Sequence, residues 1–286
     1  MKSSLRIAII IVLLFSFILA NNALAFRITP ASFEINLKKG ETQSLELSVF
    51  NDSPNPIICQ VYATGYQVGR DGKPVFEETE ETDTSPFSAR EMVKIEESEI
   101  TIPANGEKKI AISVNLPRTV SEREYFATIM AVTQSTSVLK KYQQKKEVVT
   151  QMKINRRLGA ILRINVEGPT VVKKAEIIDF DVKERKGQNI IVIATLKNKC
   201  SVNLDAEGEV LIKNSEHRII AKFPLQGANK AVRGDKTFIF PQASRDFSGV
   251  VEQPLSAGDY LAEVSFDYGY RFNKITREIA FKVEEK

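Results

Sequence analysis

The chain contains 286 residues, with 40 lysines and arginines against 36 aspartates and glutamates. Lys2 and Arg6 fall in the first segment, so the rest of the chain carries 38 basic and 36 acidic residues and lacks the basic surplus of nucleic-acid-binding proteins. Two cysteines and one histidine exclude a disulfide-rich scaffold and leave too few ligands for a common zinc site.

Residues 1–25 have the pattern of a secretory signal peptide. A basic start is followed by the 14 largely apolar residues Ile7 to Ala20, and Ala23 and Ala25 give a small–x–small cleavage pattern. An uncleaved anchor is the alternative, although the run is short for crossing a bilayer. We expect a mature chain that begins near Phe26, has no transmembrane helix, and is periplasmic or secreted.

After this segment the hydrophobic residues alternate with a period of two, which is typical of β-strands. Asp71 and Gly72 between two extended stretches predict a β-hairpin. No stretch has the apolar stripe of a helix, so the sequence predicts an all-β protein. The alternating runs of the first half are Leu45, Leu47 and Val49; Ile57, Cys59, Val61 and Ala63; Ile110, Ile112, Val114 and Leu116; and Tyr125, Ala127, Ile129 and Ala131.

The second half repeats the order of the first. Alternating residues from Ile190 lead into Asn198, as the earlier run leads into Asn51. Each half then has a proline, a leucine, a turn and a tyrosine that opens another alternating run, with the tyrosines at Tyr125 and Tyr260. Paired sheets that bury one face each need this alternation. We therefore predict two immunoglobulin-like β-sandwich domains in tandem, residues 26–168 and 169–286.

The repeated tyrosines and asparagines are predicted to be structural. A tyrosine at the start of the sixth strand is typical of a tyrosine corner, in which the hydroxyl bonds to nearby backbone. The asparagines are expected to form turns. Cys59 and Cys200 fall in different halves on the apolar side of their strands, which favours two buried thiols, with an interdomain disulfide as the alternative.

The sequence offers little for catalysis. His217 lies in a polar segment that predicts an exposed hairpin, and no Gly-x-Ser-x-Gly elbow or phosphate-binding loop is present. Residues 76–84 crowd several carboxylates into what we expect to be a solvated connection, with calcium binding as an alternative. We expect a non-enzymatic protein without cofactor or metal, and a hydrolase built on His217 is the remaining alternative.

A basic stretch interrupts the repeat at residues 134–157, where the first half is expected to have a long inserted loop. Such a loop is often functional, and its charge would suit an acidic partner or an anionic envelope polymer. A mobile, solvated excursion is the alternative. Its candidate binding residues are Lys140, Lys141, Lys145, Lys146, Arg156 and Arg157.

The strand expected at residues 157–166 would close the first domain and could lie at a sheet edge. An edge strand exposes backbone groups that can pair with another chain. Its alternating apolar residues are the candidates for contact with a partner. They are Leu158, Ala160, Leu162 and Ile164.

Residues 27–167 resemble the periplasmic pilus-assembly chaperones of the chaperone–usher system. The resemblance lies in "ITPASFEINLKKGETQSLELSVFND", in "IPANGEKKIAISVNLPRTVSEREYFATIMAV" and in the alternating final strand. It implies that the final strand completes a pilin-like subunit and that basic residues in the interdomain cleft hold the subunit's carboxylate. Arg163 is the implied cleft base, and Ser32 occupies the first-strand position where the family has a second one.

Our leading hypothesis from the sequence is thus a chaperone-like protein that binds an extracytoplasmic, pilin-like subunit by edge-strand addition. The alternative is a structural or adhesive cell-envelope module that binds a surface polymer or a matrix protein.

Overall fold

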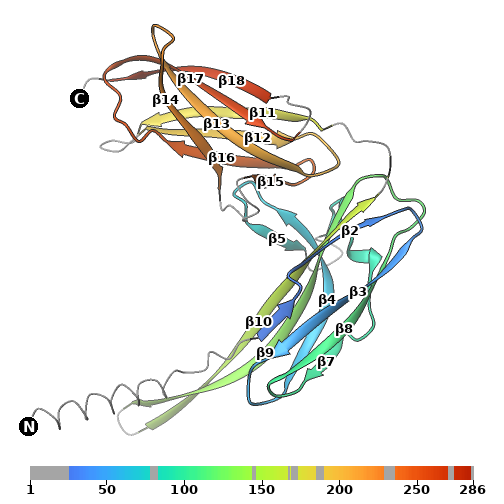
Figure 1. The fold of residues 1–286 in the computed structure, drawn as a ribbon. Helices are drawn as coiled ribbons and strands as arrows, with labels where there is room; N and C mark the ends of the chain where they lie inside the picture. The colour runs from blue at the N-terminus through green and yellow to red at the C-terminus, as the bar shows by residue number, and fades with distance from the viewer. Residues whose placement is uncertain are drawn as a thin grey trace, which may run out of the picture.

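The computed structural model describes residues 26–77, 83–143, 146–166, 168, 173–184, 190–228, 236–269 and 274–284, without the side chains of residues 134–154. The predicted signal peptide, residues 1–25, lies outside the described residues. Within these ranges, no helix is long and apolar enough to cross a membrane. The chain forms two β-sandwich domains, as the sequence predicts, and Figure 1 shows them set at an angle to each other.

The first sandwich is built from a four-stranded and a six-stranded sheet. All strand pairs are antiparallel except β2 with β10, which run parallel over residues 161–166 of β10. A short 3-10 helix, η1 (Arg90–Met92), precedes β6. In spatial order, one sheet contains β1 (Phe26–Thr29), β3 (Thr42–Asn51), β8 (Gly106–Asn115) and β6 (Val93–Ile95). The other contains β2 (Ser32–Leu37), β10 (Lys146–Val166), β9 (Glu124–Gln143), β4 (Ile57–Val68) and β5 (Pro74–Glu77), with β7 (Glu99–Ile102) paired to β4.

The second sandwich consists of eight strands, in which β14 pairs with both β13 and β16. In spatial order its strands are β11 (Ala175–Glu184), β12 (Ile190–Asn198), β16 (Ser244–Val250), β14 (Ile219–Gly227), β13 (Leu204–Asn214), β17 (Gly258–Asp267) and β18 (Lys274–Val283), with β15 (Thr237–Ile239) paired to β13. The chain passes from the first sandwich to the second between β10 and β11. The boundary predicted at residue 168 falls in this connection.

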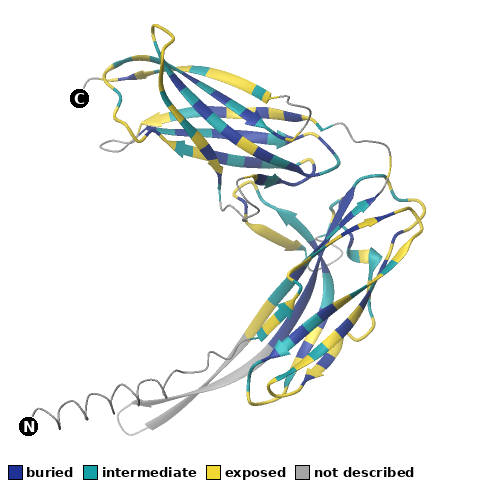
Figure 2. Ribbon diagram, viewed as in Figure 1, coloured by how far each residue is buried: buried dark blue, intermediate teal, exposed yellow. Residues whose placement is uncertain are grey.

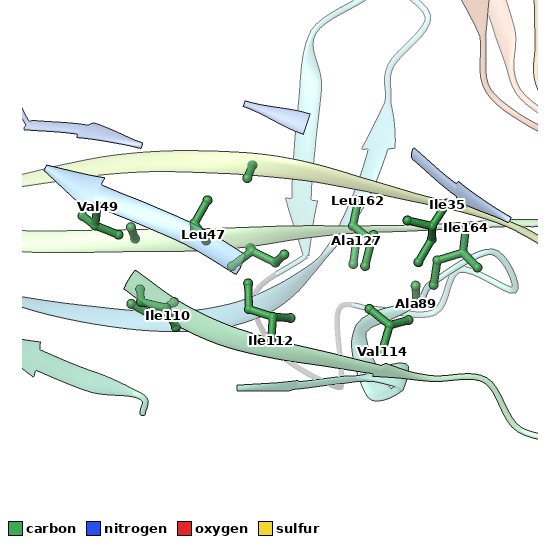
Figure 3. Packing of buried hydrophobic residues seen from close by; sticks show 14 of the residues in the cluster. Ile35, Leu47, Val49, Ala89, Ile110, Ile112, Val114, Ala127, Leu162 and Ile164 are labelled. Atoms are coloured by element: carbon green, nitrogen blue, oxygen red, sulfur yellow. The ribbon is translucent and has the colours of Figure 1, made fainter. Parts of the chain in front are cut away.

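Each sandwich has its own apolar core, and buried residues alternate with exposed ones along most strands (Figure 2). In the first core, Leu47 of β3 lies opposite Ile110 of β8, and the side chains of the other sheet face them (Figure 3). Full burial of one such side chain contributes roughly 1.5–3 kcal/mol. The period-two pattern therefore corresponds to two apolar faces packed against each other in each domain.

The repeated tyrosines and asparagines have matching roles in the two domains. The Tyr125 hydroxyl donates to the Ser121 carbonyl at 3.3 Å, and the Tyr260 hydroxyl donates to the Ser256 carbonyl at 2.9 Å, so both predicted tyrosine corners are confirmed. The Asn51 amide donates to the Asn55 and Pro103 carbonyls. The Asn198 amide makes the equivalent bonds to the carbonyls of Val202 and Ile239, at 2.8 and 3.1 Å. Each asparagine thus ties the turn after its strand to a second, distant segment.

Substitution of Asn198 by alanine should destabilise the second domain by about 2–4 kcal/mol, because it removes the acceptor of the Cys200 N–H and leaves two carbonyls unpaired at a fully buried position. Asn214→Ala is the matched control, because its side chain accepts backbone bonds in the exposed hairpin between β13 and β14. The control should cost less than about 1 kcal/mol in chemical denaturation. Equal costs for the two variants would contradict the structural role of Asn198.

The expected loop at residues 134–157 is wrong, because strands β9 and β10 continue through it as an antiparallel hairpin. Their register runs without a break from Asn165 opposite Glu124 to Lys146 opposite Gln143. Strand β4 pairs with β9 only up to Thr133, so the hairpin extends beyond the sheet (Figure 1). The stretch contains two Thr and three Val, which favour strands, but it lacks a sustained apolar alternation.

Cys59 and Cys200 are both buried thiols and are not joined in a disulfide, which confirms the prediction. Burial raises the pKa of Cys59 to about 11 and also raises the pKa of Cys200. We expect an Ellman assay at pH 8 to find no reactive thiol in the native protein and two per chain in guanidinium chloride, because a thiol reacts as its thiolate. Absence of thiols in the denatured, unreduced protein would instead indicate a disulfide.

Candidate functional site

The proposed partner-binding residues of β10 lie in the protein's own core, which corrects the edge-strand prediction. Over residues 161–166, β10 pairs with β9 on one side and with β2 on the other, so this part of it is not an edge. Ala160, Leu162 and Ile164 are fully buried, and Leu158 is half-buried. Ile164 lies opposite Ile35 of β2, and Figure 3 shows both side chains in the core. Alternation alone does not distinguish a face that covers the domain's own core from one that covers a partner.

Arg163 points to the other face of β10 and lies at the junction between the two domains. Its guanidinium forms ion pairs with Glu34 at 3.2 Å and with Glu124 at 2.6 Å, and it donates to Asn203 of the second domain. Glu124 also accepts the backbone N–H of Asn203 at 2.7 Å. Two carboxylates already balance this cation, so it acts as a connection between domains and is poorly suited to hold a partner's carboxylate. Ser32 lies opposite Ile161, at the start of β2.

Aromatic side chains from both domains fill the rest of the junction. Phe126 and Phe87 of the first domain contact Phe240 of the second, with ring centroids 4.3 and 6.5 Å from Phe240. All three are buried. Beside them, Arg70 of the β4–β5 turn forms an ion pair with Asp246 at 2.5 Å and donates to Thr195 at 2.7 Å. The junction is therefore packed and hydrogen-bonded, as within a single domain.

Most of the basic residues proposed for binding lie on the hairpin. Lys140 and Lys141 are opposite Val149 and Val148, and Lys146 begins β10. Lys145 lies outside the described residues. Arg156 and Arg157 are exposed, at the point where the hairpin joins the sheet. The backbone thus brings these residues to one projecting hairpin, and their part in binding stays a prediction.

The described residues include His217, the candidate catalytic residue, and part of the acidic stretch considered for calcium. His217 is exposed in the turn between β13 and β14, in agreement with the predicted hairpin. Among the described residues, no group of three His, Cys, Asp or Glu side chains is placed to hold a metal ion. Of the acidic stretch 76–84, residues 78–82 are not described.

Glu77 and Asp83 border that undescribed stretch. Both are partly buried, whereas the sequence predicted a solvated connection here. The Glu77 side chain accepts from Gln67 at 2.8 Å, and the Ser88 hydroxyl donates to Asp83 at 2.5 Å. Gly65 leaves room for the second carboxyl group, since a Cβ there would lie 2.7 Å from the Asp83 Cγ. Burial, with further contributions from Asp83, raises the pKa of Glu77 to about 7.

This raised pKa predicts a pH-dependent stability. The folded protein holds the proton of Glu77 more tightly than the unfolded chain does, so its contribution is complete below about pH 4.5 and is lost as the pH rises to about 7. The free energy of unfolding, measured by denaturant titration from pH 4.5 to 8, should therefore fall more steeply for the wild type than for Glu77→Gln. Parallel profiles for the two proteins would contradict the assignment.

A hollow on the first sandwich brings together residues that no sequence pattern groups. It has a volume of about 330 Å³, is open to solvent, and lies where β4 approaches η1 and β6. This volume is at the lower end of the range typical of ligand sites. Its lining residues are Val61, Tyr62, Ala63, Arg90, Glu91, Val93, Ile95 and Ser98.

The hollow combines an apolar wall with an aromatic ring and charged groups. Val93 and Ile95 are half-buried, and Glu91 is exposed. The Nη1 atom of Arg90 is buried and makes no hydrogen bond within the described part of the chain. A buried donor without an acceptor is costly, so the guanidinium of Arg90 is suited to donate a hydrogen bond to an oxygen atom of a ligand. The arrangement can bind a small polar or anionic group and has no nucleophile paired with a base.

A family model described as "WxL Interacting Protein, peptidoglycan binding domain" matches residues 27–125. All the residues that line the hollow lie within this match. Among curated proteins, no significant sequence match is found.

Among solved structures, the chain is similar to fimbrial chaperones at low sequence identity. The class 5 fimbriae chaperone CfaA is 14% identical, with 89% of this chain and 98% of that chain covered and a TM-score of 0.42. The Salmonella enterica SafB chaperone, in a complex with the SafA pilin, gives 12% identity, coverage of 91% and 99%, and a TM-score of 0.41. The Pseudomonas aeruginosa CupB2 chaperone gives 11% identity, coverage of 89% and 100%, and a TM-score of 0.36.

Proposed function

We propose that this chain is an exported, non-enzymatic binding protein of the cell envelope, and that its first sandwich binds peptidoglycan at the hollow between β4, η1 and β6. The observation that carries the proposal is the coincidence of two independent features. The matching family model is named for peptidoglycan binding, and the hollow lies entirely within residues 27–125. This corresponds to the envelope-module alternative from the sequence.

The hollow has the chemistry that such a polymer requires. The ring of Tyr62 offers an apolar face to a sugar ring or to an aliphatic side chain of the polymer, and the carboxylates of the wall peptides suit the Arg90 guanidinium. The apolar wall of Val93 and Ile95 adds desolvated contact area.

Co-sedimentation of the mature protein with purified sacculi tests the proposal. The wild type should pellet with the sacculi, and Tyr62→Ala should raise the dissociation constant at least about tenfold, which corresponds to about 1.4 kcal/mol per site. Lys94→Gln is the matched control, because Lys94 is exposed on β6 and does not line the hollow. Failure of the folded wild type to pellet would refute the proposed function.

A second candidate function is the binding of an extracytoplasmic protein subunit, as in the leading hypothesis from the sequence, but at a different part of β10. Strand β2 pairs with β10 only from Ile161 onward, so the outer edge of β10 from residue 146 to 160 has no strand partner among the described residues. A segment of an extracytoplasmic subunit could add there as an extra strand. Cysteine cross-linking from position 155 to a copurified subunit would support it, and cross-linking only from the hollow would contradict it.

A further inference from the structure

The outer edge of β4 has a gap beside the hollow. Strand β7 pairs with β4 over residues 57–60, and β5 pairs with it over residues 65–68. On its other edge, β4 is paired with β9 throughout residues 59–65. Val61 reaches Ser98 on the outer edge, so within the described part of the chain residues 62–64 have a strand neighbour on one edge only.

The direction of the backbone at this gap follows from its neighbours. The Val61 N–H donates to the Ser98 carbonyl at 2.8 Å, on the edge that faces away from β9. In an antiparallel ladder, the N–H and C=O of residues two apart point to the same edge. Ala63 must therefore direct its N–H and C=O to the edge that Val61 uses. Gly65, two residues further, pairs with Glu77 of β5.

These backbone groups face the hollow, because Ala63 is one of its lining residues and is only half-buried. An N–H and C=O pair on one residue of an open strand edge is the arrangement that pairs with an extended peptide. Buried backbone groups are almost always hydrogen-bonded, so a ligand that supplies both an acceptor and a donor gains on binding here. Arg90 lines the same hollow, and its buried Nη1 has no hydrogen-bond acceptor within the described part of the chain.

We propose that the hollow recognises the peptide part of peptidoglycan and not its glycan strand. One residue of a short, extended wall peptide pairs with Ala63 as a strand would, and a carboxylate of the peptide accepts from Arg90. Tyr62 and the apolar wall contact the aliphatic side chains. This inference rests on the proposed function, since it names the part of the polymer that the same site binds.

Isothermal titration with soluble ligands tests the inference separately from the function. A purified wall tetrapeptide should bind the wild type, and a tetramer of N-acetylglucosamine should not. Arg90→Gln should weaken peptide binding at least about tenfold, while Lys94→Gln should leave it unchanged. The same peptide, N-methylated at its central amide, should also bind at least about tenfold more weakly, because it no longer has a donor for the Ala63 carbonyl.

The outcomes distinguish the two proposals. Binding of the wild type to sacculi but not to the peptide, or equal binding of the glycan tetramer, would overturn the inference and leave the proposed function standing. Binding of the peptide without binding to sacculi would support the peptide-binding site and contradict the proposed binding of the polymer. Unchanged affinity for the N-methylated peptide would overturn the strand-like pairing at Ala63.

Discussion

Leu162→Asp is expected to prevent stable folding of the first sandwich. The Leu162 side chain is fully buried in the core, and β10 is held there by β2 and β9. An unpaired carboxylate at such a position, together with the lost apolar burial, should cost about 4 kcal/mol or more, a large part of a domain's stability. Circular dichroism and chemical denaturation would report this loss directly.

The neighbouring residue provides the control. Ile161 lies on the opposite face of β10 and is half-buried, so Ile161→Asp should cost only about 1 kcal/mol and leave the protein folded. If Leu162→Asp instead folded normally, the apolar face of β10 would not belong to the core. That result would support the hypothesis that β10 donates its apolar residues to a partner subunit.

Phe240→Ala is expected to loosen the junction between the two sandwiches. The Phe240 ring packs against Phe126 and Phe87 of the first domain and is only 3% exposed. Its removal should cost about 3–5 kcal/mol, as for other buried aromatic side chains. Calorimetry should show one unfolding transition for the wild type and two separate transitions for the variant, because the variant domains no longer stabilise each other.

Small-angle scattering adds a geometric readout to this prediction. The wild type should fit one fixed bend, whereas Phe240→Ala should fit only a mixture of bends. Val250→Ala, at an exposed position of the second domain, should change neither measurement. A cost below about 1 kcal/mol for Phe240→Ala, with unchanged scattering, would show that the polar contacts of Arg70 and Arg163 hold the junction without the aromatic cluster.

The all-β class, the two sandwiches, the tyrosine corners and the buried thiols could be predicted because each depends on local alternation or on a repeated motif. The role of β10 could not, since its partner strand β2 lies more than 120 residues earlier and the parallel pairing leaves no local signal. The hairpin at 134–157 was missed for a related reason. Its strands extend beyond the sheet, and their sequence lacks the apolar alternation that marks the other strands.

The hollow could not be predicted because its residues come from separate segments, and each looks ordinary in its own strand. Val61 and Ala63 fall in a predicted strand, and no pattern in the sequence singles out Arg90 or Glu91. Their proximity depends on where β7 ends and β5 begins along β4, which is a matter of tertiary register.

Hydrogen–deuterium exchange of the mature protein, free and bound to sacculi, tests directly whether peptidoglycan binds at the hollow. Binding should slow exchange at residues 61–64 and 90–95, with little change in the second sandwich. Slowed exchange confined to the β9–β10 hairpin or to the second sandwich, with residues 61–64 and 90–95 unaffected, would contradict it.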